Sequence, residues 1–152
     1  ITKIKLKKTI SLLNEEMKKK FAISKPKILV TGLNPHAGED GLLGQQDSKI
    51  IAPVIKDFQK KNVCVDGPVA ADTAFLRKNI TKYDVILTMY HDQGLPVIKF
   101  DNFKTTVNVT LGLPIVRVSV DHGTALDLVG TGKIDTSSFE QAIKVAKKLC
   151  NA

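Results

Sequence analysis

The segment "YDVILTMYHDQGLP" (residues 83–96) predicts an apolar β-strand followed by a polar loop. Residues 83–90 are rich in the aromatic and β-branched side chains that favour strands. Residues 91–96 contain histidine, aspartate, glycine and proline, which are typical of turns and loops. The same change from an apolar run to a polar turn occurs twice earlier in the chain, and this repetition decides the fold.

The three strand patterns alternate with helical ones. Earlier strands are predicted at 27–33 and 63–67, with helices between at 48–62 and 71–79. Parallel strands need long crossover connections, so this order predicts an α/β fold with a parallel-rich sheet flanked by helices. Asp47 or Ser48 is the expected N-cap of the helix at 48–62. The remaining predicted elements are helices at 1–21 and 138–150 and strands at 106–112 and 115–120.

Length and composition indicate one globular domain. With 152 residues and 43% apolar content, the chain can bury one core. No apolar run approaches the roughly 20 residues needed to span a bilayer, and no signal-peptide pattern opens the chain. Cys64 and Cys150 form no CxxC pair. We therefore expect a cytoplasmic protein with no membrane partner.

The net charge of +8 is concentrated at one end of the chain. Residues 1–27 hold nine Lys and two Glu, a net of +7, which leaves +1 for the rest. No aromatic stacking residues or known reading motif accompany this basic segment, as nucleic-acid binding would require. We expect a solvated helix face and no nucleic-acid partner.

Polar residues follow each of the three predicted parallel strands. His36, Asp72, His91 and Asp92 all lie on predicted strand-to-helix loops. The carboxyl ends of parallel strands share one edge of a sheet, where ligands bind, so these residues should share one face. Two imidazoles on converging loops suit Zn²⁺, Mn²⁺, Co²⁺ or Ni²⁺. The spacing matches no local ligand motif, and hydrogen-bonded loop histidines remain the alternative.

The segment "DHGTALDLVGTG" (121–132) is a second dense group of polar residues. Thr124 could cap a short helix that begins near Ala125, whose N-terminus would favour an anion or a nucleotide. Asp127 could accept hydrogen bonds from ribose hydroxyls. There is no GxGxxG motif, and a capped turn with a glycine-rich exit explains the residues equally well.

Lys99, Asn108 and Arg117 form a looser polar set. Arg117 interrupts the apolar run "PIVRVSV" and is expected to face away from Val116 and Val118. A cation within a strand suggests an anionic ligand, with a salt bridge to a carboxylate as the alternative.

Five stretches together resemble the carboxyl-terminal half of the 4-hydroxythreonine-4-phosphate dehydrogenase family: "LNPHAGEDGLLG", "GPVAADTAF", "MYHDQGLPVIKF", "VNVTLGLPIVRVSVDHGTALDLVGTGKID" and "SFEQAI". The resemblance implies NAD-dependent oxidation of 4-phosphooxy-L-threonine, followed by loss of CO₂ to give 3-amino-2-oxopropyl phosphate, in pyridoxal 5′-phosphate biosynthesis. It also implies a homodimer with a fold similar to isocitrate and isopropylmalate dehydrogenases, of which this chain would be an incomplete part.

The resemblance implies a role for each group of polar residues. His36 and His91 would bind a divalent metal, zinc or alternatively magnesium, manganese or cobalt. Lys99, Asn108 and Arg117 would bind the substrate. Asp72 and Asp92 are candidates for acid-base or supporting roles. The residues expected near the adenosine of NAD are His122, Gly123, Thr124, Ala125 and Asp127.

The family enzyme is roughly twice this length, and its third metal histidine precedes the match. We therefore expect residues 1–118 to form a partial metal- and substrate-binding domain, and residues 119–152 to pack on an amino-terminal domain. The 152-residue chain alone should be inactive. Two alternatives stay open: a related dehydrogenase of erythronate or threonate 4-phosphate, and a non-catalytic metal- or phosphate-binding domain.

Overall fold

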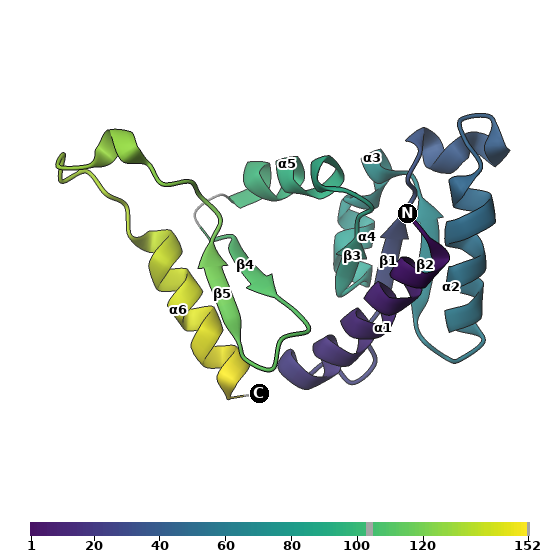
Figure 1. Ribbon diagram of the computed structural model, residues 1–152, viewed down its shortest axis with the longest axis horizontal. Coiled ribbons are helices and arrows are strands. Elements are labelled where there is room, and N and C mark those ends of the chain that lie inside the picture. The colour runs from purple at the N-terminus through teal and green to yellow at the C-terminus, as the bar shows by residue number, and fades with distance from the viewer. Residues whose placement is uncertain (103–104, 152) are drawn as a thin grey trace. The chain divides into compact units, whose positions relative to one another are not determined.

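The computed structural model describes residues 1–102 and 105–151, which form two compact units (Figure 1). The first unit is Ile1–Val97 and the second is Ile98–Ala152. The division at 118/119 expected from the sequence concerns packing on a further domain, and it stays a prediction. The two units are described separately below.

The first unit is built on a three-stranded parallel sheet. Its strands are β1 (Ile28–Thr31), β2 (Val65–Val69) and β3 (Val85–Leu87), in the order β2-β1-β3. Ile28 pairs with Val65 on one side and Val85 on the other, and every residue of β1 is buried. The parallel sheet flanked by helices confirms the fold class predicted from the alternation of strands and helices.

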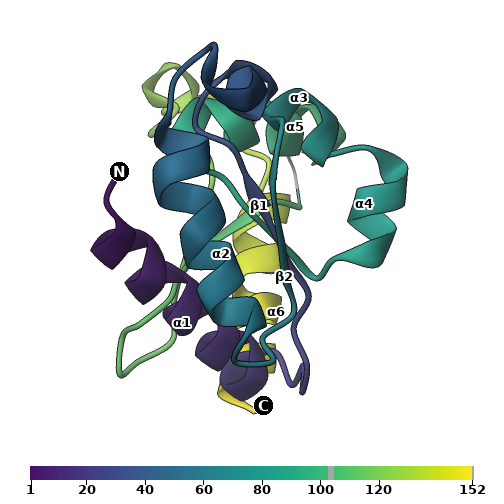
Figure 2. The ribbon, with the colours of Figure 1, turned by 90° about the vertical axis from the view of Figure 1, so that its right-hand side faces the viewer.

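Helices α1 (Lys3–Lys20) and α2 (Ala52–Gln59) cover the sheet and complete the core. Figure 2 shows α2 lying along β1 and β2, with α1 beside it. Ile10 of α1, Val54 of α2 and Ile28 of β1 have no exposed surface. Burying a side chain of this size contributes about 1.5–3 kcal/mol to the stability of the fold. These contacts hold the sheet and therefore the strand ends that carry the polar loops.

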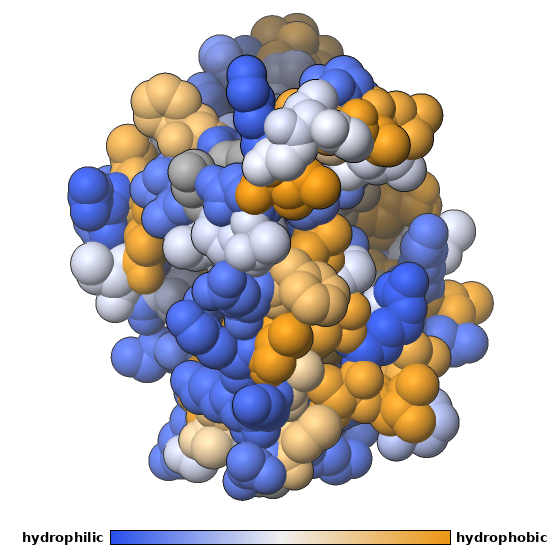
Figure 3. Space-filling model, turned by 90° about the vertical axis from the view of Figure 1, so that its left-hand side faces the viewer, coloured by the Kyte–Doolittle hydropathy of each residue, from blue (hydrophilic) through white to orange (hydrophobic). Residues whose placement is uncertain are grey.

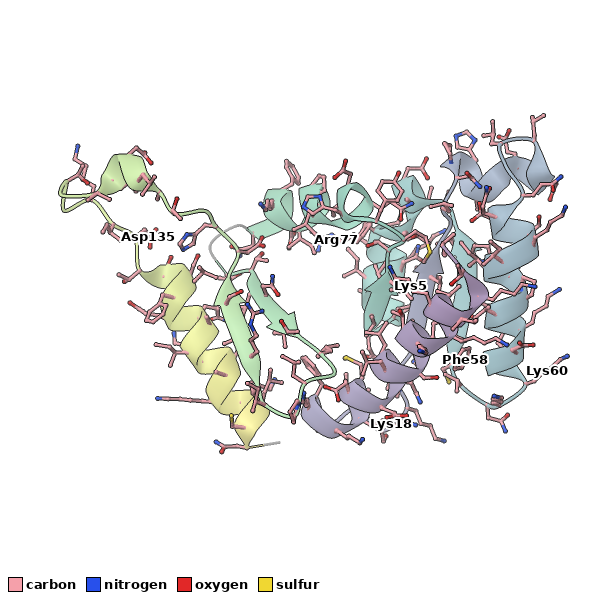
Figure 4. All side chains as sticks on the ribbon, viewed as in Figure 1. Lys5, Lys18, Phe58, Lys60, Arg77 and Asp135 are labelled. Carbon is pink, nitrogen blue, oxygen red and sulfur yellow. The ribbon has the colours of Figure 1, made fainter. Side chains whose placement is uncertain are left out.

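Most lysines of α1 lie on its solvent side. Lys5 and Lys18 are exposed, whereas Leu6 and Met17 on the same helix are buried (Figure 4). The helix is therefore amphipathic, as its sequence pattern predicts. Among the described residues, no helix is long and apolar enough to cross a membrane.

Two segments of the first unit differ from the sequence-based expectation. The helix expected at 71–79 is broken into α3 (Ala71–Ala74) and α4 (Arg77–Lys82). The loop expected at 91–96 is instead the first half of α5 (His91–Asn102), even though Pro96 lies within it. Pro96 has no N–H to donate to the carbonyl of Asp92, so this helix lacks one of its backbone hydrogen bonds.

The second unit is a β-hairpin covered by a helix. Strands β4 (Val107–Thr110) and β5 (Arg117–Val120) are antiparallel, and α6 (Ser137–Cys150) packs against both. A short 3₁₀ turn, η3 (Leu126–Leu128), lies between β5 and α6. Both predicted strands and the closing helix are confirmed.

Apolar side chains remain exposed in the second unit. Phe139 and Ile143 of α6 are 62% and 41% exposed, and Ile134 just before it is 66% exposed. Figure 3, which views the side on which α6 lies, shows hydrophobic side chains gathered between hydrophilic ones. Contiguous apolar surface is typical of interaction sites. This surface is compatible with the expected packing of residues 119–152 on a further domain.

Candidate functional site

His36 lies on a left-handed turn that follows β1. The turn spans Pro35–Gly41, and φ is 53° at His36, 54° at Ala37, 40° at Glu39 and 53° at Asp40. Left-handed backbone costs roughly 1–2 kcal/mol for each residue with a Cβ. Strain of this kind persists only where surrounding structure enforces it, and it is found most often at functional sites.

Asp47 provides the support that this turn needs. Its side chain is 2% exposed and accepts hydrogen bonds from the Leu33 amide at 2.8 Å, the Asn34 amide at 3.2 Å and Asn34 Nδ2 at 2.9 Å. A Cβ on Gly32 would lie 2.8 Å from Asp47 Oδ1, so only glycine fits beside the carboxylate. The prediction of Asp47 or Ser48 as a helix N-cap is wrong, because helical geometry already begins at Asp47, as the π turn η2 (Asp47–Ile51), and the Asp47 carboxylate faces the preceding loop.

The imidazole of His36 is oriented by Glu39. Nδ1 of His36 lies 2.7 Å from Glu39 Oε1, and both side chains are largely exposed. This hydrogen bond raises the pKa of His36 above 6.5, helped by the charge of Glu39 and, more weakly, by that of Asp72. Because the folded-state pKa is raised, the pair stabilises the fold below about pH 6.5 and loses that effect as the pH rises through the folded-state value.

Replacing Glu39 by Gln is expected to lower the pKa of His36. The amide retains a hydrogen-bonding group but removes the negative charge that favours the imidazolium form. An NMR titration of the His36 ring protons in both proteins measures the difference. Glu15→Gln, which removes an exposed carboxylate paired with Lys19, is the control and should leave the titration of His36 unchanged. An unchanged His36 titration would contradict the role of Glu39.

His91 and Asp92 form a second imidazole-carboxylate pair, in the first turn of α5. Nδ1 of His91 lies 2.7 Å from Asp92 Oδ1, and both side chains are exposed. In the structure both residues follow β3, as predicted, but they lie on a helix and not on a loop.

A cavity of about 270 Å³ lies at the carboxyl edge of the sheet. His36 and Asp72 line it together, and so do Tyr90 and Gln93, which flank the second pair in sequence. Asp72 belongs to the first turn of α3 and not to a loop. The structure thus brings His36 and Asp72 together, whereas His91 and Asp92 are outside the cavity lining.

The two histidines have the same local arrangement, an imidazole whose Nδ1 lies beside a carboxylate oxygen. A carboxylate at Nδ1 fixes the tautomer and orientation of each ring and leaves Nε2 available, an arrangement typical of metal-binding histidines. Within residues 1–102 and 105–151, no group of three or more His, Cys, Asp or Glu side chains is placed to hold a metal ion. Metal binding by His36 and His91 therefore stays a prediction.

Asn108 and Arg117 share one face of the β4-β5 hairpin. Asn108 pairs with Ser119, and Thr110 pairs with Arg117. These four side chains therefore project from one face of the hairpin, and Val109 and Val118 project from the other. Arg117 is exposed and donates from Nη1 to Thr110 Oγ1, a neutral acceptor, at 2.7 Å, and within residues 1–102 and 105–151 it forms no ion pair. Lys99 is exposed on α5.

A second cavity, of about 480 Å³, lies within the second unit. His122, Gly123, Thr124 and Ala125 line it, with Ile134 and Ser138 among the other lining residues. Asp127 is not among the lining residues. Thr124 does not cap the helix as expected, because Ala125 is the N-cap and adopts a left-handed conformation, with φ 46°. Since η3 is only three residues long, it offers no helix N-terminus for an anion, and the cavity itself is the feature that suits a ligand.

The chain is similar throughout to one family of proteins. The family model described as pyridoxal phosphate biosynthetic protein PdxA matches residues 1–146. The chain is 52% identical over 149 residues to the 4-hydroxythreonine-4-phosphate dehydrogenase of Pseudoalteromonas translucida, covering 98% of this chain and 45% of that protein. It is 50% identical to the enzyme of the same name from Methylococcus capsulatus, with the same coverage. The chain thus spans less than half the length of these relatives.

Two solved structures are similar to the chain over nearly its whole length. The crystal structure of 4-hydroxythreonine-4-phosphate dehydrogenase from Klebsiella pneumoniae superposes with a TM-score of 0.84 at 35% identity, over 98% of this chain and 45% of that one. A terephthalate 1,2-cis-dihydrodiol dehydrogenase from Burkholderia xenovorans superposes with a TM-score of 0.73 at 28% identity, over 97% of this chain and 47% of that one.

Proposed function

The chain belongs to the PdxA family of pyridoxal phosphate biosynthetic proteins, and from this membership we propose that its full-length protein is a 4-hydroxythreonine-4-phosphate dehydrogenase. The proposed reaction transfers a hydride from C3 of 4-phosphooxy-L-threonine to NAD, and the resulting ketone loses CO₂ to give 3-amino-2-oxopropyl phosphate. The proposed enzyme is a cytoplasmic homodimer. The match over residues 1–146 is the observation that carries the proposal.

The two imidazole-carboxylate pairs support a divalent metal site. His36 and His91 would bind the ion through Nε2, while Glu39 and Asp92 hold the rings by Nδ1. When bound, a divalent ion supplies a Lewis acid that lowers the pKa of the substrate hydroxyl. Zinc is the proposed metal, with magnesium, manganese or cobalt as alternatives. Asp72, which lines the same cavity as His36, is positioned as a candidate acid or base.

The hairpin face supports substrate binding. The Arg117 guanidinium matches the planar geometry of a phosphate or carboxylate, and Asn108 on the same face can both donate and accept hydrogen bonds. Lys99 would add a second cation. These three residues would orient the anionic ends of the substrate and leave the C3 carbon free to react.

The cavity formed by His122, Gly123, Thr124 and Ala125 supports binding of NAD. Its volume of about 480 Å³ suits a nucleoside, and its mixture of apolar side chains and polar groups is typical of such sites. Asp127 lies outside the lining, and its proposed partner is a ribose hydroxyl of NAD. NAD supplies the hydride acceptor.

The decisive experiment measures NAD reduction by the zinc-loaded full-length protein with 4-phosphooxy-L-threonine. We expect substrate-dependent NADH formation accompanied by release of CO₂. NADH formation with erythronate or threonate 4-phosphate, and none with 4-phosphooxy-L-threonine, would overturn the substrate assignment. Absence of NADH with all three would overturn the dehydrogenase assignment and favour a metal- or phosphate-binding domain.

A dehydrogenase of another substrate is the second candidate. The similarity to a terephthalate dihydrodiol dehydrogenase favours it, because that protein shares the fold and its name specifies a different substrate, a dihydrodiol. Arg117, Asn108 and Lys99 would recognise phosphate or carboxylate in either case, so the substrate panel distinguishes the candidates.

A further inference from the structure

Asp135 lines the cavity of about 480 Å³ in the second unit, at the point where the loop after η3 meets α6 (Figure 4). Of the lining residues within 105–151, it is the only carboxylate, and none is a lysine or an arginine. A ligand that enters this cavity therefore meets a carboxylate and no lysine or arginine side chain.

The carboxylate of Asp135 is held in place by the backbone of α6. The Ser137 amide donates to Asp135 Oδ1 at 3.0 Å, which forms an Asx turn. A carboxylate can accept several hydrogen bonds, so it can accept from a ligand as well as from Ser137. Its negative charge lies at the first amide of α6, where a phosphate would otherwise bind favourably. The cavity therefore favours an uncharged group with a hydrogen-bond donor over a phosphate.

The apolar part of the cavity lining suits a flat ring. Leu128, Val129 and Ile134 contribute apolar side chains to it. The turn that carries two of them is closed by its own hydrogen bonds, from the Leu128 amide to the Ala125 carbonyl at 2.9 Å and from the Val129 amide to the Leu126 carbonyl at 3.2 Å. Because Asp135 directly follows Ile134, the carboxylate adjoins an apolar wall. A planar base with an N–H group at its edge would satisfy both.

We propose that Asp135 is a specificity-determining residue that recognises the adenine of NAD by accepting a hydrogen bond from its exocyclic N6 amino group. The inference rests on the proposed cofactor site in this cavity. Adenine is planar and uncharged, and the amino group is its hydrogen-bond donor. A ribose also offers donors, but it is neither flat nor apolar and suits the apolar walls less well. Hypoxanthine carries a carbonyl oxygen in place of the amino group, which would set an acceptor against the carboxylate.

The test compares NAD with nicotinamide hypoxanthine dinucleotide in the full-length protein, through the dissociation constant measured by calorimetry and through the KM. We expect the wild-type protein to bind NAD about 10-fold more tightly, because the second cofactor loses a hydrogen bond to a charged group. In Asp135→Asn, the amide oxygen accepts from Ser137 and the NH₂ group faces the ligand. Affinity for NAD should fall and affinity for the hypoxanthine cofactor should rise, so that the preference for NAD disappears or reverses.

Asp135→Asn should preserve the fold, because asparagine forms the same Asx turn as aspartate. Asp135→Ser is the second variant, since its hydroxyl can replace the bond to Ser137 but is too short to contact the base. It should also lose the preference for NAD. A preference for NAD that survives in both variants overturns the proposal. Equal weakening of both cofactors with the preference intact would place the carboxylate at a ribose hydroxyl, and it overturns the proposal as well.

Asp127→Asn is the matched control. Asp127 lies outside the cavity lining, and its proposed partner is a ribose hydroxyl that both cofactors share. Its replacement should weaken both cofactors by the same factor and leave the preference for NAD unchanged. Equal loss of preference in Asp127→Asn and Asp135→Asn overturns the proposal. A wild-type protein that binds neither cofactor overturns the inference together with the proposed NAD site, whereas binding of both with equal affinity overturns the role of Asp135 alone.

Discussion

Replacing His91 by Ala in the full-length protein is expected to abolish metal retention and to reduce NAD reduction to background. The substitution removes one of the two imidazoles proposed to bind the metal, whose Nδ1 lies beside Asp92 Oδ1 and whose Nε2 is the proposed ligand atom. Loss of a residue that merely supports a ligand typically costs 10–100-fold in metal affinity, so loss of the ligand should cost at least about 100-fold. Metal content after dialysis and NADH formation measure the two effects.

His122→Ala is the control for metal retention. His122 is the third histidine of the chain, belongs to the second unit and contacts the Gly123 carbonyl, so its removal should leave metal content unchanged. Unaltered turnover by His91→Ala would contradict the assignment of His91 as a metal ligand. Loss of metal from both variants would show that histidine replacement acts through the fold and not through coordination.

Asp47→Ala is expected to have the largest effect on stability. The substitution leaves the amides of Leu33 and Asn34 and the side chain of Asn34 without their acceptor. Each buried donor that loses its partner costs about 1–3 kcal/mol, and partial access of water reduces the sum to roughly 3–5 kcal/mol. Urea-induced unfolding measures the loss. The left-handed turn at His36 should also lose its support, so metal affinity should fall.

Asp57→Ala is the matched control for Asp47→Ala. Asp57 forms an ion pair with Lys7 at 2.7 Å, and both side chains are about half exposed. Solvent screens such a pair, so its loss should change the unfolding midpoint far less. Similar losses in the two variants would refute the view that Asp47 acts through buried hydrogen bonds.

The segment 91–96 is predicted as a loop but is helical in the structure, and it shows why local sequence patterns do not determine every element. Glycine and proline within six residues indicate a loop, yet Gln93 and Gly94 make contacts with β1 and with the segment after β3 that keep the segment helical. Asp47 was misassigned for a similar reason. An aspartate at the start of a helix has the same local signature whether it caps that helix or accepts bonds from a preceding loop.

The sequence by itself determined the order of the strands, the parallel pairing of the first three and the edge of the sheet near which His36, Asp72 and His91 lie. These features follow from the periodicity of apolar residues and from the rule that parallel strands need crossovers. Only the tertiary structure decided that Gln93 links the two histidine-bearing segments and that Asp47 holds the turn at His36. The bond from Thr31 to Gln93 spans 62 positions, and hydrogen bonds over such separations leave no periodic pattern in the chain.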